Sequence, residues 1–139
     1  MFNKKNFSFL EIIMFGIVLV LILSVVFFMI WLGLENNKYK TAQKQIVLLQ
    51  DAVYNFYMDN NVYPTTEQGL NVLYNKPDFL STWDGPYLTK NFIKDTWRNN
   101  YIYNYPGMIN KKSFDIMSYG KDGRQGGYKL NKDLYNNEN

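Results

Sequence analysis

The distribution of hydrophobic residues divides the chain into an apolar N-terminal stretch and a patterned remainder. Between residues 7 and 34 nearly every side chain is apolar, and from residue 12 onward only Gly16, Ser24 and Gly33 interrupt the run. A helix of roughly 20 apolar residues is long enough to cross a bilayer. The stretch therefore predicts a transmembrane helix over residues 7–34, in which the Ser24 hydroxyl bonds to a carbonyl of its own helix.

A short basic leader precedes this stretch. Residues 1–6 contain Lys4 and Lys5 and no acidic residue, which favours a cytoplasmic N-terminus and an outward-facing remainder. A cleaved secretory signal would have a shorter apolar core, of about 7 to 15 residues, before a small-residue cleavage site. No Ala-x-Ala pattern follows Trp31. A plain signal anchor is the alternative, and it leaves Glu11 unexplained.

After the membrane stretch, apolar residues recur every three or four positions, as they do along one face of a helix. They are Tyr39, Ala42, Ile46, Leu49, Val53 and Phe56. Because no proline occurs before Pro64, the pattern predicts that the helix continues as an amphipathic segment through residues 35–60. Two helices joined by a bend within residues 33–37 are the alternative, since weak helix formers occur there.

A second helix is predicted shortly after the first. Thr65 and Gln68 have the spacing of a capping box, in which each residue's side chain bonds the other's backbone N–H. An apolar face follows and ends before Pro77. We therefore expect a helix over residues 64–76.

The last part of the chain predicts a β-hairpin and a loop. Two alternating, β-rich segments lie on either side of a Pro-Gly turn, which predicts an antiparallel hairpin over residues 100–119. The Gly- and Asn-rich tail, residues 120–139, is expected to be irregular, and ordered only if another part of the protein holds it. The predicted fold class is α+β, with a long N-terminal helix packed on a small antiparallel sheet in one head domain over residues 35–139.

Composition argues against an enzyme and against a nucleic-acid-binding protein. The chain has no cysteine and no histidine, so thiolate chemistry and the usual general base are missing. The net charge is +3, and the lysines and arginines after residue 35 form no cluster. Trp83 and Trp97 are expected in the core or in subunit contacts, and Lys111 and Lys112 at the exposed tip of the hairpin.

Glu11 is the only charged residue in the apolar stretch. A charge placed in hydrocarbon costs at least about 2.5 kcal/mol, and such residues are usually functional and paired. We therefore expect Glu11 to have a cationic partner at similar depth.

Four ordered motifs carry a resemblance to a known family. The basic leader followed by FSFLE at residues 7–11 resembles the class III leader of type IV pilins and type II secretion pseudopilins. The head contains YPTTEQGL at 63–70, DTWRNNY at 95–101 and SYGKDG at 118–123. These are similar to the motifs of the major pseudopilins of type II secretion systems, the general secretion pathway protein G family.

This resemblance implies a structural subunit that polymerises into a pseudopilus for protein export across the outer membrane. A prepilin peptidase would cut after Asn6 and Phe7 would be methylated, so that Glu11 faces the α-amino group of Phe7 in a neighbouring copy. Minor pseudopilins and an inner-membrane assembly platform are the other implied partners. The implied location is the bacterial inner membrane, crossed once, with the N-terminus cytoplasmic and the head periplasmic. The alternatives are a minor pilin, a competence pilin, or an uncleaved membrane-anchored interaction protein.

Several positions depart from the family pattern. Asn6 stands before the implied cut where the family has glycine, and Phe28 stands where these subunits often have proline. Thr96 and Arg98 replace the usual proline and glycine around the tryptophan of the second head motif. Since proline fixes φ and glycine permits positive φ, these two changes affect the stiffness of that loop.

The resemblance also implies a calcium site in the C-terminal loop. Asp122 matches the first family ligand, and Asp133 matches a member of a later Asp-Asp pair, but Lys132 occupies the other position. Ca²⁺ takes six to eight oxygen ligands, so the loss of a carboxylate weakens the site. Two alternatives are that the Lys132 ammonium bridges both aspartates in place of the metal, or that Asp122 lies in an ordinary turn.

Overall fold

The computed structural model describes residues 8–89 and 93–136, which group into two compact units, residues 1–36 and residues 37–139. Each unit is described by itself below. Asn6 and Phe7, the residues of the predicted processing site, lie outside the described part of the chain.

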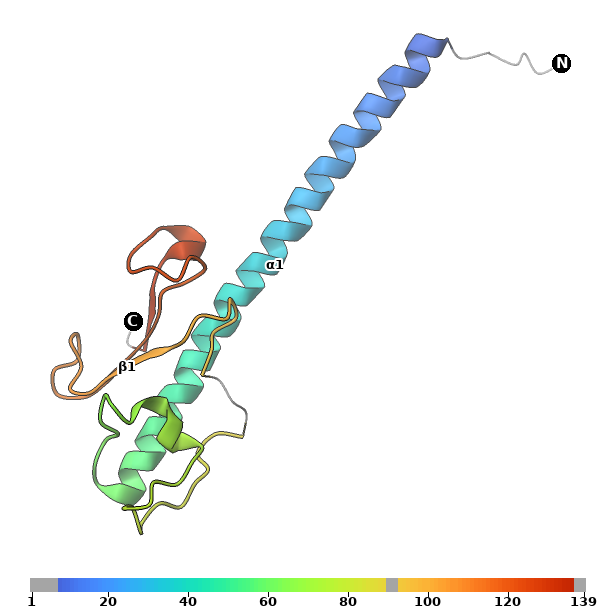
Figure 1. The fold of residues 1–139 in the computed structure, drawn as a ribbon. Helices are drawn as coiled ribbons and strands as arrows, with labels where there is room; N and C mark the ends of the chain where they lie inside the picture. The colour runs from blue at the N-terminus through green and yellow to red at the C-terminus, as the bar shows by residue number, and fades with distance from the viewer. Residues whose placement is uncertain (1–7, 90–92, 137–139) are drawn as a thin grey trace. The chain divides into compact units, whose positions relative to one another are not determined.

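Helix α1 (Phe9–Asn60) confirms the helical prediction for both the apolar and the amphipathic segments (Figure 1). Among the described residues, it is the helix that is long and apolar enough to cross a membrane. In the first unit its apolar side chains are exposed, as lipid-facing side chains must be. The hydroxyl of Ser24 donates to the carbonyl oxygen of Leu21 at 2.7 Å, as expected.

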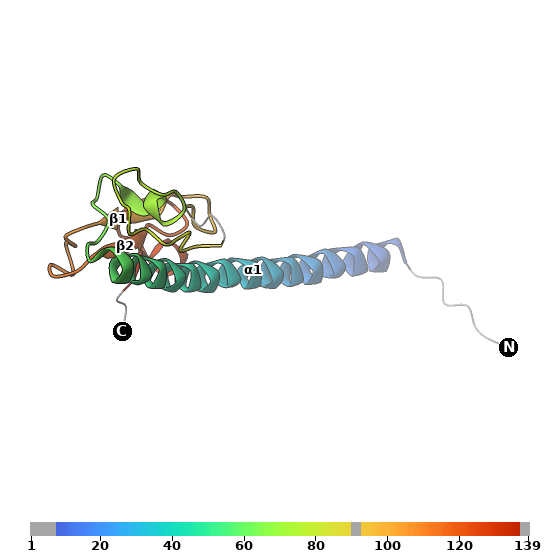
Figure 2. The same cartoon turned by 90° about the horizontal axis from the view of Figure 1, so that it is seen from below.

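The second unit, the head, is built on the predicted apolar face of α1. Five residues of that face are at most 2% exposed: Ala42, Ile46, Leu49, Val53 and Phe56. They pack with Leu73, Phe114, Ile116 and Leu134, which come from three later segments of the head. Figure 2 shows these other parts gathered on one side of α1. The head core is therefore a layer between one helical face and the rest of the unit.

The predicted hairpin is present and forms part of a three-stranded antiparallel sheet. Strand β1 (Ile102–Asn104) pairs with β2 (Asp115–Ser118), with Tyr103 opposite Ile116. Strand β3 (Leu134–Tyr135) pairs with the other edge of β2, so the strand order is β1-β2-β3.

The prediction of an irregular tail over residues 120–139 was wrong in part. The tail contains the short 3₁₀ helix η2 (Lys129–Asn131) as well as β3. All four residues of β2 are buried, so the backbone groups on both its edges need partners within the protein. Strand β3 supplies them on one edge and buries Leu134 completely.

The second predicted helix, residues 64–76, was wrong in type and length. The structure has the 3₁₀ helix η1 (Gly69–Leu73) in its place. The capping box itself forms, since the Thr65 N–H donates to Oε1 of Gln68 at 2.8 Å and the Gln68 N–H donates to the Thr65 hydroxyl at 3.3 Å. Gly69 then adopts a φ of +57°, a left-handed conformation that ends the α-helical turn.

Candidate assembly and cation-binding sites

Glu11 lies in the first turn of α1 and has a partner within its own chain. The backbone N–H of Ser8, the residue before the helix, donates to Oε2 of Glu11 at 2.8 Å. This is one half of a capping box, in which a carboxylate three residues into the helix satisfies a backbone donor. The positive end of the helix dipole also favours a carboxylate here. The Ser8-x-x-Glu11 spacing is the sequence signal for this bond, which differs from the predicted pairing with a cation.

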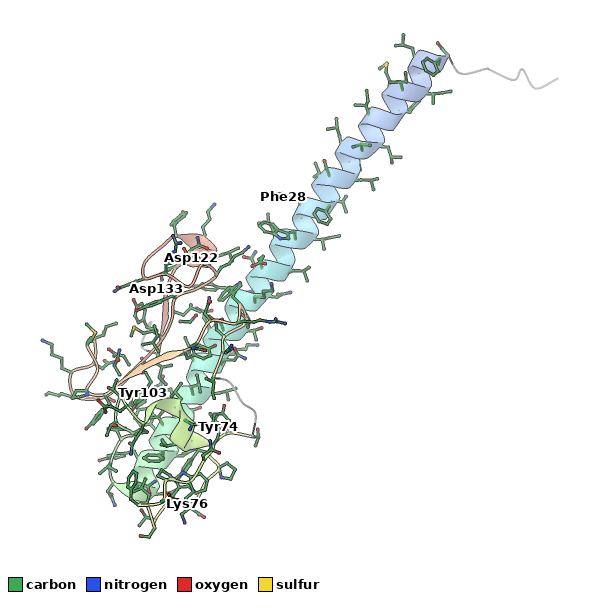
Figure 3. The ribbon with its side chains drawn as sticks, viewed as in Figure 1. Phe28, Tyr74, Lys76, Tyr103, Asp122 and Asp133 are labelled. Atoms are coloured by element: carbon green, nitrogen blue, oxygen red, sulfur yellow. The ribbon has the colours of Figure 1, made fainter. Side chains whose placement is uncertain are left out.

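The apolar half of α1 presents a continuous surface on which other helices or lipid chains can pack. Gly16 and Gly33 leave open space on it, because no described atom beyond their chain neighbours and the adjacent helix backbone lies within 4 Å of where a Cβ would be. Phe28, which stands where proline is common in the family, continues the helix and stacks on Trp31 with ring centroids 6.2 Å apart (Figure 3). The apolar half of α1 therefore carries both small and aromatic contact positions.

A buried carboxylate joins two of the head motifs. Asp95 is 5% exposed, and its Oδ1 accepts the N–H groups of Trp97 at 2.9 Å and Asn99 at 2.8 Å. Its Oδ2 accepts the hydroxyl of Ser118 at 2.6 Å. The Asn99 amide in turn donates to the carbonyl oxygen of Gly120 at 2.8 Å. The loop after Asp95 and the C-terminal loop are thereby fixed to each other.

The two departures around Trp97 have visible structural consequences. The Thr96 hydroxyl donates to the carbonyl oxygen of Lys38 at 3.0 Å, which attaches the loop to α1. Arg98 has a φ of +73°, in the left-handed region that glycine adopts without strain. Trp97 is partly buried and packs against Tyr39 with centroids 6.4 Å apart, as the core alternative for this residue predicts.

Two buried tyrosines fasten β1 to the rest of the head. The Tyr101 hydroxyl donates to Oε1 of Gln45 on α1 at 2.9 Å, and the Tyr103 hydroxyl donates to the carbonyl oxygen of Pro64 at 2.9 Å. Burial raises the pKa of both phenols far above its usual range. Sequence reasoning placed these residues in a strand but did not identify their partners, which are distant in the chain.

The predicted calcium ligands differ from each other in environment. Asp133 is 5% exposed, and its Oδ2 accepts the N–H of Gly126 at 2.8 Å and the hydroxyl of Tyr135 at 3.1 Å. Its Oδ1 is buried and has no hydrogen-bond partner among the described residues. Asp122 is exposed, and its Oδ1 accepts the N–H of Arg124 at 3.2 Å, which is the geometry of an Asx turn. Figure 3 shows both residues in the C-terminal part of the head.

The residues around Asp133 supply only part of the ligand set that a bound cation needs. An unpartnered buried carboxylate oxygen is costly unless a cation or donor satisfies it. The carbonyl oxygens of Leu130 and Lys132 lie near Gly120, since a Cβ on Gly120 would lie 3.0 and 2.9 Å from them, and the Leu130 oxygen accepts the N–H of Lys121 at 3.0 Å. Within residues 8–89 and 93–136, however, no three carboxylates, histidines or cysteines lie close enough together to hold one metal ion. Any cation here would depend on backbone oxygens and water for most of its ligands.

Comparison with known proteins identifies the family. The family model for type II secretion system (T2SS), protein G, matches residues 30–137. The chain is 35% identical over 141 residues to a type II secretion system core protein G of Vibrio cholerae serotype O1, a match that covers 96% of this chain and 92% of that protein. It is 37% identical over 132 residues to the core protein G of Aeromonas hydrophila, covering 89% of this chain and 87% of that protein.

The fold leads to the same family. The crystal structure of the major pseudopilin from the type 2 secretion system of enterohaemorrhagic Escherichia coli matches with a TM-score of 0.58 and 29% identity, over 75% of this chain and 90% of that one. The family match spans all three head motifs and all three strands of the sheet. The chain therefore belongs to the type II secretion system protein G family, and its fold is that of a major pseudopilin.

Proposed function

We propose that this pseudopilin polymerises with copies of itself into a pseudopilus that drives protein export across the outer membrane. The observation that carries the proposal is the exposed apolar half of α1, which begins with the capped carboxylate of Glu11. Such a helix can lie in a lipid bilayer as a single subunit, and it can also pack against identical helices in a filament. The exchange between the two states is possible because neighbouring helices are about as apolar as lipid chains.

Glu11 has a distinct role in each state. In the unassembled subunit, its carboxylate is satisfied by the Ser8 N–H within the same chain. After a cut behind Asn6, the new α-amino group of Phe7, once methylated, would supply a cation at similar depth in a neighbouring copy. The pairing of opposite charges offsets part of the cost of burying each of them. Repetition of this contact from copy to copy does not close into a ring and gives a filament.

The same proposal includes the location and the other partners. The chain would cross the bacterial inner membrane once, with its N-terminus in the cytoplasm and its head in the periplasm. The prepilin peptidase would process it, and minor pseudopilins and the inner-membrane assembly platform would act with it during assembly. Membership of the family supports participation in the secretion system.

We further propose that a cation, with Ca²⁺ as the first candidate, binds at Asp133. The support is the Oδ1 of Asp133, which is buried and has no hydrogen-bond partner among the described residues. Asp122 would contribute through its remaining oxygen, directly or through water. The bound ion would fix the C-terminal loop against β2, because Asp133 immediately precedes β3.

The decisive experiment for assembly is the mass of the N-terminal peptide of this protein in membranes of its own host. A peptide that begins at Phe7 and is heavier by one methyl group would agree with the proposal, because it supplies the amine that Glu11 needs. A peptide that still begins at Met1 would contradict it, since an uncleaved anchor has no α-amino group at that depth.

A further inference from the structure

The outer edge of strand β1, the edge that faces away from β2, is closed at both ends and open between them. At one end, the Tyr101 N–H donates to the carbonyl oxygen of Ile93 at 3.0 Å. At the other end, the Thr66 hydroxyl accepts the Tyr105 N–H at 2.9 Å and donates to the Tyr105 carbonyl oxygen at 3.1 Å. The opening is centred on Tyr103, and its two ends are about 13 Å apart at 3.3 Å per residue.

The backbone of Tyr103 faces this opening. Tyr103 lies opposite Ile116, but the Ile116 N–H donates to Oδ1 of Asn136 at 3.1 Å, and the Ile116 carbonyl oxygen accepts the Asn136 N–H at 3.1 Å. Ile116 therefore bonds on the β3 side, and the residue opposite it in an antiparallel pair directs its N–H and C=O to the outer edge. Among residues 8–89 and 93–136, neither of these Tyr103 groups has a hydrogen-bond partner. Tyr103 thus presents one donor and one acceptor to a partner.

A pocket of about 310 Å³ lies at the opening, which is a volume typical of ligand sites. Its lining includes Tyr103, Ile93 and Leu70 of helix η1, so part of its wall is apolar. Helix η1 lies against β1, next to the labelled Tyr103 in Figure 3. Because Tyr103 is only 6% exposed, the pocket is the route by which a partner can reach its backbone.

Two side-chain amides in the lining have engaged oxygens and available NH₂ groups. Oε1 of Gln68 accepts the Thr65 N–H at 2.8 Å, and Oδ1 of Asn71 accepts the Asn75 amide at 2.9 Å. The NH₂ group of an amide can only donate, so this side of the pocket offers hydrogen-bond donors. None of the described residues that line the pocket is acidic. Such a wall suits a carboxylate, which accepts hydrogen bonds more strongly than a neutral oxygen does.

We propose that the C-terminal end of a second protein, in an extended conformation, binds in this pocket. Its backbone bonds to the N–H and C=O of Tyr103, as in the addition of a strand to a sheet edge. Its terminal carboxylate accepts the NH₂ groups of Gln68 and Asn71, and an apolar last side chain contacts Leu70 and Ile93. A chain end fits better than an internal strand, because a strand that runs through would meet the closures at both ends of the opening.

A peptide titration of the full chain in detergent micelles tests the site. The probe is the N-acetylated peptide Ser-Thr-Val-Leu with a free carboxylate, followed by NMR of the isotopically labelled protein. It should shift the Tyr103 amide signal in a saturable way and slow the exchange of that amide with water, because the N–H gains an acceptor. The same peptide with a C-terminal amide should bind about tenfold more weakly, since it lacks the charge-assisted bonds.

A variant of the pocket rim supplies a second readout. Asn71 is exposed, so Asn71→Ala should leave the head folded and remove most of the difference in affinity between the two peptides. Asn55→Ala is the matched control, because Asn55 is exposed on α1 and does not line the pocket. Its affinities for both peptides should equal those of the native chain.

Four results would overturn the inference. Two of them are equal binding of the two peptides and an unshifted Tyr103 signal at millimolar peptide. The third is a Tyr103 amide that is already protected from exchange in the free protein, which would mean that the chain closes its own edge. The fourth is protection that appears on filament formation without peptide, which would assign the edge to a second copy. Because the titration uses unassembled protein, its failure would leave the proposed pseudopilus standing, and a lack of filaments would not change its result.

Discussion

The backbone N–H of Ser8 donates to the carboxylate of Glu11 at 2.8 Å, so the charge at the start of the apolar helix is satisfied before any second copy arrives. This bond offsets part of the cost of a carboxylate at the start of an apolar helix, where an unpaired charge would be costly in a membrane. It also separates two properties of Glu11, namely its ability to accept a hydrogen bond and its negative charge. The two can be tested with different substitutions.

Replacement of Glu11 by Gln should keep the cap and abolish filament growth. The amide oxygen of Gln can still accept the Ser8 N–H, so helix α1 and the head should stay intact, but no charge remains to pair with an α-amino group. Glu11→Leu should abolish filaments as well, with the head still folded and the chain still inserted. Filaments are counted by electron microscopy of sheared cells, and insertion is checked by carbonate extraction. Normal filaments from the Gln variant would show that the cap is sufficient and that the charge pair is not required.

Arg98 departs from the family pattern, which has glycine at this position. Its backbone adopts a conformation that glycine reaches without strain. At a φ of +73°, a residue with a Cβ is strained by about 1–2 kcal/mol. Arg98→Gly should therefore raise the free energy of unfolding by about 1 kcal/mol, after allowance for the greater freedom of glycine in the unfolded chain. The measurement is chemical denaturation of the full chain in detergent micelles. Arg98→Ala is the control, because it removes the charge and keeps the Cβ, and an equal gain from it would assign the effect to the charge.

Local sequence signals predicted local structure well, and they failed where distant parts of the chain decide the outcome. The capping box at Thr65 and Gln68 forms as expected, but the helix beyond it is shortened by the left-handed Gly69. The spacing of apolar residues identified the buried face of α1, since a helical period is a property of neighbouring residues.

Strand β3 was missed because two residues in a Gly- and Asn-rich tail carry no strand period of their own, and their order comes from pairing with β2. The Asp95–Ser118 bond joins residues 23 positions apart. Nothing in the spacing of these two residues indicates that they meet. The resemblance alone suggested Asp122 and Asp133 as calcium ligands, whereas only the structure shows that Oδ1 of Asp133 has no hydrogen-bond partner within residues 8–89 and 93–136.

The buried tyrosines predict a loss of stability in strong alkali. The folded pKa of Tyr101 lies above its unfolded value of about 10, because burial disfavours the phenolate and the charge of Asp95 adds to this. The unfolded chain therefore releases its proton first, and stability that is fully present below about pH 10 is lost as the pH rises toward the folded pKa.

The measurement is the free energy of unfolding of the full chain between pH 8 and the alkaline limit of the assay. Tyr101→Phe should flatten the alkaline decline, although it lowers stability at neutral pH by removing the bond to Gln45. Tyr128→Phe is the control, because Tyr128 is 80% exposed. An unchanged alkaline decline in Tyr101→Phe would mean that other groups cause it.

A cation at Asp133 should stabilise the head in a way that depends on ion concentration. A ligand that binds the folded state alone adds RT ln(1 + [L]/Kd) to the free energy of unfolding, which is about 2.7 kcal/mol at a hundredfold excess over Kd. The full chain should therefore melt at a higher temperature in calcium than in chelator. Asp133→Asn should abolish that difference, because it removes the negative charge of the carboxylate that would bind the ion.

Asp122→Ala distinguishes a weak ligand from a simple turn residue. If Asp122 contributes an oxygen to the ion, this variant should need a higher calcium concentration for the same rise in melting temperature, whereas a turn residue should leave the calcium dependence unchanged. The Lys132 alternative predicts the opposite pattern for the native protein, because an ammonium that bridges the aspartates would make the melting temperature equal in calcium and in chelator. In that case Lys132→Ala should create calcium dependence where the native chain shows none, since no ammonium would then compete with a metal ion for Oδ1 of Asp133.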